Sequence, residues 1–368
     1  MPESTLGIGI IGVSPVRGWA ATAHIPALRA LPSYEIRALS AHNVESARAA
    51  GEVFGVNAVF SDHEQLVTQP DIDMVVVTVK VPHHRKLVSA ALAAGKAVYC
   101  EWPLGRDLDD ARAMAALAVD QGVRTIVGLQ ARQAPAIEFV QQLLRDGYVG
   151  EVLSTTMVGL SIPGDAVVQP NAYMLDRANG ANVLTIAVGH SLDLLNYVLG
   201  EFADLSAVSD LRRPLITIEE TGERIVKTAP DQIAVIGTLT SGATASIHVR
   251  EAVAGGTGFL WEINGTDGTL QITADAAVPG IFPLSVAGAR GRNEPAELAV
   301  PAALTQKWPA LTSLEGAPAF NVGRVYAAFA ADIDKGTHTV PDFADAVRSH
   351  QVIAAIERSA ISGERVKA

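Results

Sequence analysis

Glycine residues follow the first apolar segment of the chain in a pattern that suits phosphate binding. Residues 9–13 are predicted to form a strand, and the turn after it contains Gly12, Ser14, Gly18 and Trp19. Glycine at such a turn lets the backbone approach a pyrophosphate at the start of the next helix. The G-x-G-x-x-G spacing is not intact, because Ser14 occupies the middle glycine position and Gly18 comes one residue late. An ordinary turn also fits, but the place of this turn at the first strand of an alternating α/β segment favours a dinucleotide site.

The end of the second predicted strand, at residues 34–41, bears on the choice between NAD and NADP. An acidic residue here would hold the adenosine ribose, but His42 and Asn43 follow the strand. These side chains are consistent with ribose contact, with tolerance of a 2′-phosphate, or with a plain turn. Because no Arg or Lys directly follows the strand, we expect NAD as the cofactor and leave NADP open.

Lys80 directly follows a buried, β-branched strand expected at residues 74–79. Ligands of open α/β sheets bind at the carboxyl ends of the strands. The Lys80 ammonium group is therefore a candidate proton carrier beside a cofactor. The alternative interpretation is a solvated surface charge.

One predicted helix, over residues 183–199, places several polar side chains on the same face. Ile186, His190, Asp193 and Tyr197 recur at i, i+4, i+7 and i+11. Asp193 is spaced to orient the imidazole of His190, which then could move a proton. A purely structural histidine fits the pattern equally well. The segment before this helix supplies candidates for binding hydroxyl groups, namely Tyr173, Asp176 and Asn179.

Two kinds of domain are needed to position these residues. Residues 9–129 alternate short apolar strands with helical stretches, which predicts a doubly wound parallel sheet covered on both faces. After about residue 150 the strand-like segments follow one another with few helices between them, at 152–159, 232–240, 243–250, 259–264 and 269–273. We expect an α/β Rossmann domain over residues 1–127 and an α+β domain with an open antiparallel sheet over residues 128–368.

Composition excludes several classes of protein. The chain has 368 residues, of which 49% are hydrophobic, so it can bury a large core and is not disordered. Its formal charge of −11 offers no basic stripe to nucleic acid. Neither a membrane-spanning run nor a signal peptide is evident, and the lone Cys100 fits a reducing compartment, so we expect a cytoplasmic protein. No His/Cys/Asp cluster has the spacing of metal ligands.

Several segments together resemble the Gfo/Idh/MocA oxidoreductases. They are the glycine turn, residues 24–26, residues 93–103 and residues 265–270. The resemblance covers nearly the whole chain and is closest to the Gal80 branch at residues 12–19, 101–102, 129–132 and 189–190. It implies a dinucleotide fold followed by a sheet whose face holds a carbohydrate substrate, in a homodimer or homotetramer. The branch includes fungal transcriptional regulators that bind a dinucleotide.

The resemblance also reveals two departures from the family pattern. Trp102 stands where the family has a catalytic lysine, and Ile186 stands where it has an aspartate four residues before His190. Tryptophan can stack on a sugar but cannot move a proton, so Lys80 is the possible substitute, and the nearby His84 matches a family histidine. The residues that we expect at the cofactor are Gly12, Ser14, Gly18, Trp19, His42, Val79, Glu101 and Gln130. Those expected in catalysis are Lys80, His190 and Tyr173, and those at the substrate are Trp102, Arg132, Asp176, Asn179 and Asp193.

Three functions stay open at this stage. The first is an NAD(P)-dependent oxidoreductase that transfers hydride at a ring hydroxyl carbon of a sugar or glycoside. The second is a redox-neutral glycosidase that oxidises, eliminates, adds water and re-reduces with one bound NAD. The third is a non-catalytic, dinucleotide-binding regulator, which the loss of the lysine and aspartate favours.

Overall fold

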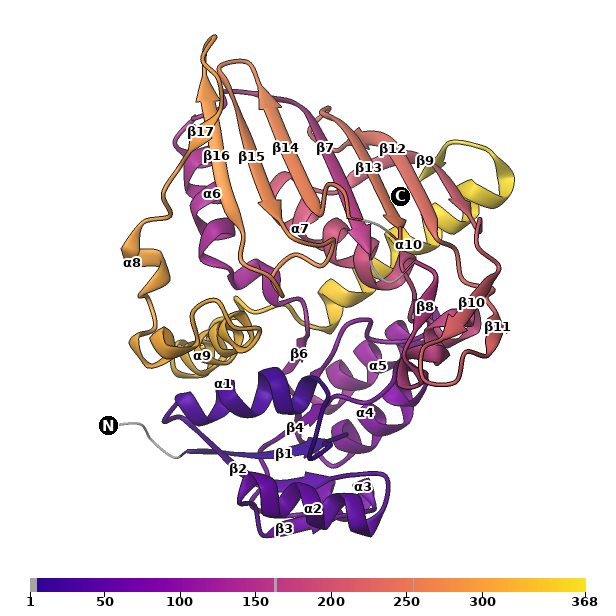
Figure 1. Cartoon of the computed structure of the whole chain (residues 1–368). Coiled ribbons are helices and arrows are strands. Elements are labelled where there is room, and N and C mark those ends of the chain that lie inside the picture. The colour runs from indigo at the N-terminus through magenta and orange to yellow at the C-terminus, as the bar shows by residue number, and fades with distance from the viewer. Residues whose placement is uncertain (1–4, 162–163, 254) are drawn as a thin grey trace. The chain divides into compact units, whose positions relative to one another are not determined.

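The computed structural model describes residues 5–161, 164–253 and 255–368 (Figure 1). Contacts divide the chain into two units, the first made of the residues up to Gln133 together with Gln306–Val347, and the second of Ala134–Thr305 with Arg348–Ala368. This division differs from a single boundary at residue 127. The reason is that helix α9 (Ala319–Lys335) packs against α1 (Ile25–Ala30) of the first unit. None of the helices in the described ranges is long and apolar enough to cross a membrane.

The first unit is built on a six-stranded parallel sheet in the order β3-β2-β1-β4-β5-β6. The strands are short and apolar, and the central ones are buried along nearly their whole length, as expected for a sheet covered on both faces. Their bounds are β1 Leu6–Ile11, β2 Tyr34–Ser40, β3 Ala58–Phe60, β4 Met74–Val77, β5 Ala97–Cys100 and β6 Thr125–Val127.

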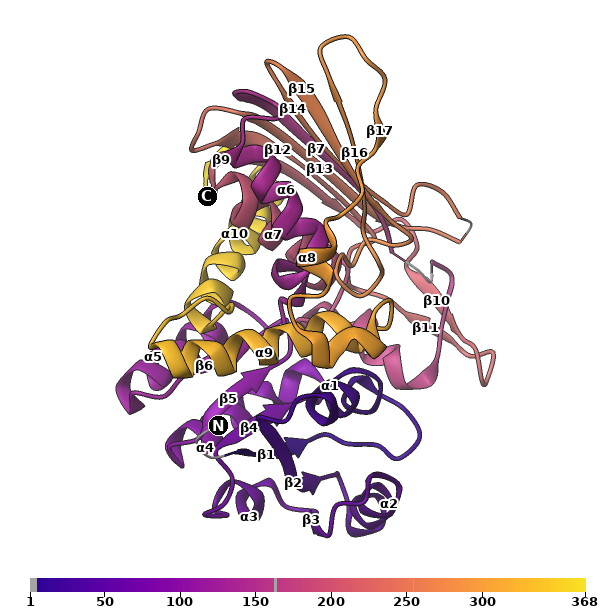
Figure 2. The ribbon, with the colours of Figure 1, turned by 90° about the vertical axis from the view of Figure 1, so that its left-hand side faces the viewer.

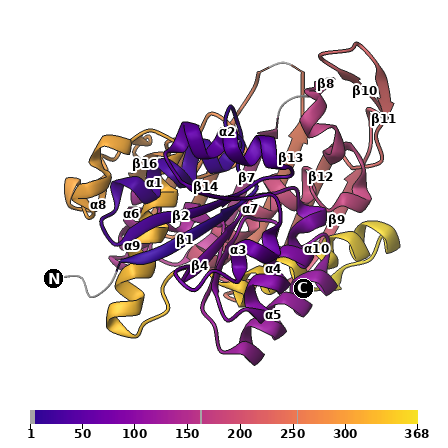
Figure 3. The same ribbon diagram turned by 90° about the horizontal axis from the view of Figure 1, so that it is seen from below.

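Helices cover both faces of this parallel sheet (Figure 3). Helices α1, α2 (Val44–Phe54) and α9 lie on one face, and α3 (His63–Val67), α4 (His84–Ala93) and α5 (Leu108–Gln121) lie on the other. Because strand order reverses between β1 and β4, their carboxyl ends form the switch point at which open α/β sheets bind ligands. The expected doubly wound Rossmann domain is confirmed.

The second unit is built on a nine-stranded sheet in the order β17-β16-β15-β14-β7-β13-β12-β9-β18. Its neighbouring strands pair antiparallel except for β7 and β13, so the sheet is mixed rather than purely antiparallel. The bounds are β7 Val152–Ser161, β9 Phe202–Asp210, β12 Gln232–Leu239, β13 Thr244–Glu251, β14 Phe259–Gly265, β15 Gly268–Ala274, β16 Ser285–Arg290, β17 Ala296–Glu297 and β18 Val366–Lys367.

Helices α6 (Pro135–Arg145) and α7 (Gly189–Leu199) lie on one face of the large sheet, as does the part of α10 (Phe343–Ser362) that belongs to this unit (Figure 2). A smaller sheet, β11-β10-β8, lies at one end of the unit, with bounds β8 Ala166–Val167, β10 Leu215–Ile218 and β11 Arg224–Val226. The short α8 spans Ala302–Thr305.

Helices α1 and α7 are each preceded by a π-turn. The π-turns are η1 (Ala20–His24) before α1 and η6 (Leu184–Val188) before α7. A π-turn bonds residue i to i+5 and so departs from the α-helical spacing. Ile186 lies in η6, so the expected alignment on one helix face holds only for His190, Asp193 and Tyr197 in α7. The five 3₁₀ turns are η2 (Val81–His83), η3 (Gln130–Gln133), η4 (Gln169–Leu175), η5 (Arg177–Asn179) and η7 (Pro309–Leu314) in the described ranges.

Candidate active site

The turn after β1 needs glycine at residue 12. Gly12 has φ of +100°, and a Cβ there would lie 2.7 Å from Val79 Cγ1 and 3.0 Å from the Thr78 carbonyl carbon. The backbone N–H groups of Gly12 and Val13 donate to the carbonyl of Ser40, at 2.9 and 3.2 Å. The ends of β1, β2 and β4 therefore meet closely around Gly12, with Val79 packed against it.

The start of the following helix is more open. Gly18 has φ of +98°, and no atom lies within 4 Å of the place where its Cβ would be. Its carbonyl accepts from Thr22 N–H at 3.1 Å, which begins the helical segment of η1 and α1. Trp19 is half-buried, and its Nε1–H is buried without a hydrogen-bond partner. This combination of open space and an unsatisfied donor at a helix start fits a phosphate-containing ligand.

The end of β2 carries no carboxylate. Asn43 caps α2, because its Oδ1 accepts from Ser46 N–H at 2.7 Å, and its Nδ2 lies 2.9 Å from His42 Nε2. His42 itself is exposed. The cap gives Asn43 a structural role, and contact of His42 with a cofactor stays a prediction.

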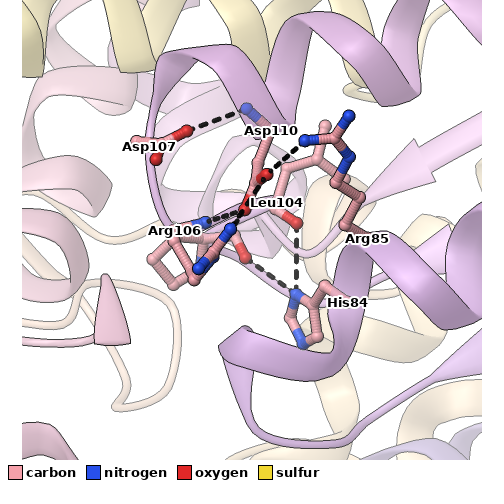
Figure 4. Close-up of polar contacts among 7 residues, drawn as sticks. His84, Arg85, Leu104, Arg106, Asp107 and Asp110 are labelled. Carbon is pink, nitrogen blue, oxygen red and sulfur yellow. Dashed lines mark hydrogen bonds and ion pairs between the residues drawn. The ribbon is translucent and has the colours of Figure 1, made fainter. Parts of the chain in front are cut away.

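Lys80 lies beyond the carboxyl end of β4, which ends at Val77 rather than at the expected residue 79. It is exposed and precedes η2. The loop is held by His84, whose Nε2 lies 3.0 Å from the Val79 carbonyl and whose Nδ1 lies 3.0 Å from that of Pro103. The same Nδ1 lies 3.2 Å from the carbonyl of Leu104 (Figure 4). Burial lowers the pKa of His84, and the carbonyl groups that face both ring nitrogens oppose that shift. His84 thus ties the Lys80 loop to the Trp102–Pro103 segment, a structural role for this family histidine.

An ion-pair cluster around the buried carboxylate of Asp110 holds the chain after Trp102. Asp110 accepts from Arg106 at 2.8 Å and from Arg85 at 3.0 Å, and its own N–H donates to the Asp107 cap at 2.8 Å (Figure 4). The two guanidinium groups outweigh the effect of burial and lower the pKa of the Asp110 carboxyl group, although burial alone would raise it. Trp102 is buried at 6% exposure, between β5 and this cluster.

Glu101 is oriented by a histidine. Its Oε1 lies 2.8 Å from Nε2 of His24, and Nδ1 of His24 lies 2.7 Å from the hydroxyl of Tyr326 on α9. A neutral imidazole satisfies both contacts by donating to the carboxylate and accepting from the tyrosine. Gly128 leaves room for the carboxylate, since a Cβ there would lie 2.8 Å from Glu101 Oε2. In the sequence, His24 is part of residues 24–26, which resemble the family, but nothing there predicts that it orients Glu101.

The polar residues after β6 differ in whether their side chains are satisfied within the protein. Gln130 is buried, and its Oε1 has no hydrogen-bond partner. Arg132 forms an ion pair with Asp345 at 3.0 Å between Nη1 and Oδ1, within the first unit. The unsatisfied oxygen favours a ligand at Gln130, whereas the ion pair gives Arg132 a structural role, and its contact with substrate stays a prediction.

His190 of the second unit is buried on α7, and burial lowers its pKa from 6.5 to about 4. The imidazole is therefore neutral at physiological pH. Its Nδ1 has no hydrogen-bond partner, so Asp193 does not orient the ring through that atom. Asp193 is itself buried at 1% exposure. A neutral imidazole with an unsatisfied ring nitrogen is suited to exchanging a proton with a bound hydroxyl group.

The segment before α7 uses its polar side chains to close loops. Asp176 Oδ1 accepts from Ala178 N–H at 3.0 Å and lies 3.2 Å from Thr228 Oγ1. Asn179 Nδ2 donates to the Tyr173 carbonyl at 2.7 Å. The Tyr173 phenol is half-buried, and burial raises its pKa. These bonds account for Asp176 and Asn179 as turn residues, and their binding of substrate stays a prediction.

Comparison with known proteins places this arrangement in a family. Residues 6–129 match the model GFO_IDH_MocA, described as an oxidoreductase family with an NAD-binding Rossmann fold. Residues 135–274 match the model of the Gal80p C-terminal domain. The chain belongs to the Gfo/Idh/MocA oxidoreductase family, in its Gal80-like branch, and its first unit is an NAD-binding Rossmann domain.

Individual relatives include both enzymes and regulators. The chain is 31% identical to dehydrogenase aclE of Aspergillus oryzae, over 90% of this chain and 88% of that protein. It is 30% identical to D-apiose dehydrogenase of Paraburkholderia graminis, over 70% of this chain and 66% of that protein. It is 27% identical to the galactose/lactose metabolism regulatory protein GAL80 of Saccharomyces cerevisiae, over 78% and 72%.

Solved structures share the fold across the chain. A super-repressor mutant of Gal80p from Saccharomyces cerevisiae aligns with a TM-score of 0.88 at 24% identity, over 99% of this chain and 98% of that one. Levoglucosan dehydrogenase in complex with NADH and levoglucosan aligns with a TM-score of 0.83 at 22% identity, over 99% of each chain.

Proposed function

We propose that this protein is an NAD-dependent dehydrogenase that oxidises a hydroxyl-bearing carbon of a sugar. The observation that carries the proposal is the open turn at Gly18 on the switch point of the parallel sheet, with the unsatisfied Trp19 Nε1 and Gln130 Oε1 in the same unit. The similarity to dehydrogenase aclE and to D-apiose dehydrogenase supports it. NAD would supply the hydride acceptor.

The chain itself supplies binding and proton transfer. The Gly12–Gly18 turn and Trp19 would hold the cofactor, and His24 would keep the Glu101 carboxylate in one orientation. Oxidation of an alcohol releases a proton, which a neutral His190 can accept, and Lys80 is the second candidate for carrying it. Trp102 has no group that can move a proton, and its proposed role is to pack against the sugar ring. We also propose, from the sequence, that the protein acts in the cytoplasm as a homodimer or homotetramer.

A regulator is the second candidate, favoured by the match of residues 135–274 to the Gal80p C-terminal domain and by Trp102 in place of the family lysine. A redox-neutral glycosidase is a further alternative, because Lys80, Tyr173 and His190 are more proton carriers than one hydride step needs.

One set of assays separates these functions. Purified protein is mixed with NAD and a panel of neutral sugars, and NADH formed in proportion to oxidised sugar is the expected result. Chromogenic glycosides test the glycosidase. If they release aglycone far in excess of the NAD supplied, and solvent deuterium enters the sugar at C2, the protein is a glycosidase and not a dehydrogenase. Binding of NAD without either reaction would favour the regulator. No thermal stabilisation by NAD or NADP would contradict the cofactor site itself.

A further inference from the structure

A pocket inside the second unit contains a charged pair, and neither member of the pair is among the residues expected at the active site. The described residues that line it include Asn171, Met174, Asn182, Ile186, Lys227 and Glu251. Lys227 directly follows β11, and Glu251 is the last residue of β13. The small sheet and the central strands of the large sheet therefore each contribute one charge.

Lys227 and Glu251 form an ion pair in which Nζ donates to Oε2. The lysine side chain is only 2% exposed and the glutamate side chain 15%. Burial raises the pKa of Glu251, and the neighbouring Lys227 opposes that shift. Such a pair is a poor source of stability, because removing two charges from water costs about as much as their attraction returns. A role in binding explains its presence in a pocket better than a role in folding.

Hydrogen-bonding capacity remains on both members of the pair. An ammonium group has three N–H donors, and a carboxylate can accept several bonds. Among the described residues, Glu251 Oε2 is the acceptor for Lys227 Nζ, which leaves N–H donors and the second carboxylate oxygen for a ligand. Asn171 and Asn182 add polar groups to the lining, while Met174 and Ile186 supply an apolar wall.

The chemistry of this lining selects a class of ligand. Each hydroxyl group of a diol can both donate and accept a hydrogen bond, so two neighbouring hydroxyls match an ammonium group beside a carboxylate. The apolar wall suits the C–H face of the same ring. Because the pair has no net charge, an anionic group would gain the attraction of Lys227 but meet the repulsion of Glu251.

We propose that the Lys227–Glu251 pair is a subsite that binds two adjacent hydroxyl groups of an uncharged polyol. The proposal rests on the proposed function, since it names the class of sugar that the dehydrogenase would accept. It selects neutral sugars over uronic acids.

The test measures sugar binding separately from hydride transfer. Levoglucosan, D-apiose, D-glucose and D-glucuronate are titrated by calorimetry into the protein saturated with NADH, where no oxidation can occur. We expect at least one neutral sugar to bind, and D-glucose to bind at least about tenfold more tightly than D-glucuronate. Glu251→Gln and Lys227→Met should each weaken binding of the neutral sugar by about ten- to a hundredfold, as expected for a lost hydrogen bond to a charged group.

A change in selectivity is the sharper readout. Glu251→Gln removes the repulsive carboxylate and keeps the ammonium group, so it should improve binding of D-glucuronate relative to D-glucose. The matched control is Glu357→Gln, which removes the carboxylate of an exposed ion pair with Arg177 in the same unit and should change neither affinity. An unchanged circular-dichroism spectrum and a cooperative thermal unfolding transition report that each variant is folded.

Two results would overturn the subsite. One is binding of none of the neutral sugars by the parental protein, and the other is an affinity within about twofold of the parental value in both pocket variants. Sugar binding that responds to the variants without any NADH formation from NAD would instead refute the dehydrogenase and leave the subsite standing.

Discussion

Replacing Gly12 or Gly18 by alanine separates a packing requirement from a conformational one. The two glycines have nearly the same φ, +100° and +98°. Placing an alanine in a left-handed conformation costs roughly 1–2 kcal/mol. At Gly12 the new methyl group would also lie 2.7 Å from Val79 Cγ1, and such overpacking adds about 1–3 kcal/mol. We therefore expect Gly12→Ala to reduce the free energy of unfolding by about 2–5 kcal/mol, and Gly18→Ala by about 1–2 kcal/mol.

Urea unfolding gives these free energies, and titration of NADH fluorescence gives the affinity for cofactor. Gly18→Ala should weaken NADH binding despite its smaller effect on stability, because its methyl group enters the open space at the helix start. Gly55→Ala is the control, since Gly55 ends α2 at φ of +62° with nothing within 4 Å and no expected role at the cofactor. Equal losses of stability in Gly12→Ala and Gly18→Ala, or NADH affinity in Gly18→Ala equal to that of the control, would refute this reasoning.

Three further predictions concern proton carriers and buried contacts. Lys80→Ala and His190→Ala should each lower turnover by about 10²–10⁴-fold with little change in NADH affinity, and steady-state kinetics showing near-parental turnover in both would reject their assignment. Below pH 6.5 the unfolded chain binds a proton at His190 that the folded protein excludes down to pH about 4, so stability should fall by about 3 kcal/mol over that range. A pH series of urea unfolding should show this loss in the parental protein and not in His190→Gln. Tyr326→Phe leaves the buried Nδ1 of His24 without its partner and should cost about 1–3 kcal/mol in urea unfolding, and a free energy of unfolding equal to the parental value would count against the His24 contact.

Local sequence patterns predicted the first unit well. Short, β-branched apolar runs such as residues 74–77 are typical of a strand that is covered on both faces, and their alternation with helices predicts the doubly wound sheet. The same patterns could not place α9 in that unit, because nothing in residues 319–335 says which sheet they cover. The π-turns before α1 and α7 were also missed, since their residues have ordinary helical composition.

The candidate site was predicted to different degrees. Gly12 and Lys80 follow strands whose ends must meet, so sequence order was enough to locate them. Arg132 has the same kind of position, but its ion pair with Asp345 joins residues far apart in the chain and has no local signal. The pair of Lys227 and Glu251 was missed for the same reason: each is one charge at the end of a strand, and the fold alone brings them together in a pocket.

The division of the chain into units determines when each unit can fold during synthesis. Residues 306–347 complete the first unit, yet they are made after the whole of residues 134–305. As the chain leaves the ribosome, α1 therefore cannot pack against α9 until the intervening sheet has been synthesised. The hydrogen bond between His24 and Tyr326 forms equally late. A nascent chain released at residue 133 would expose the apolar surface that α9 covers, so the cofactor domain becomes complete only after residue 347 has been synthesised.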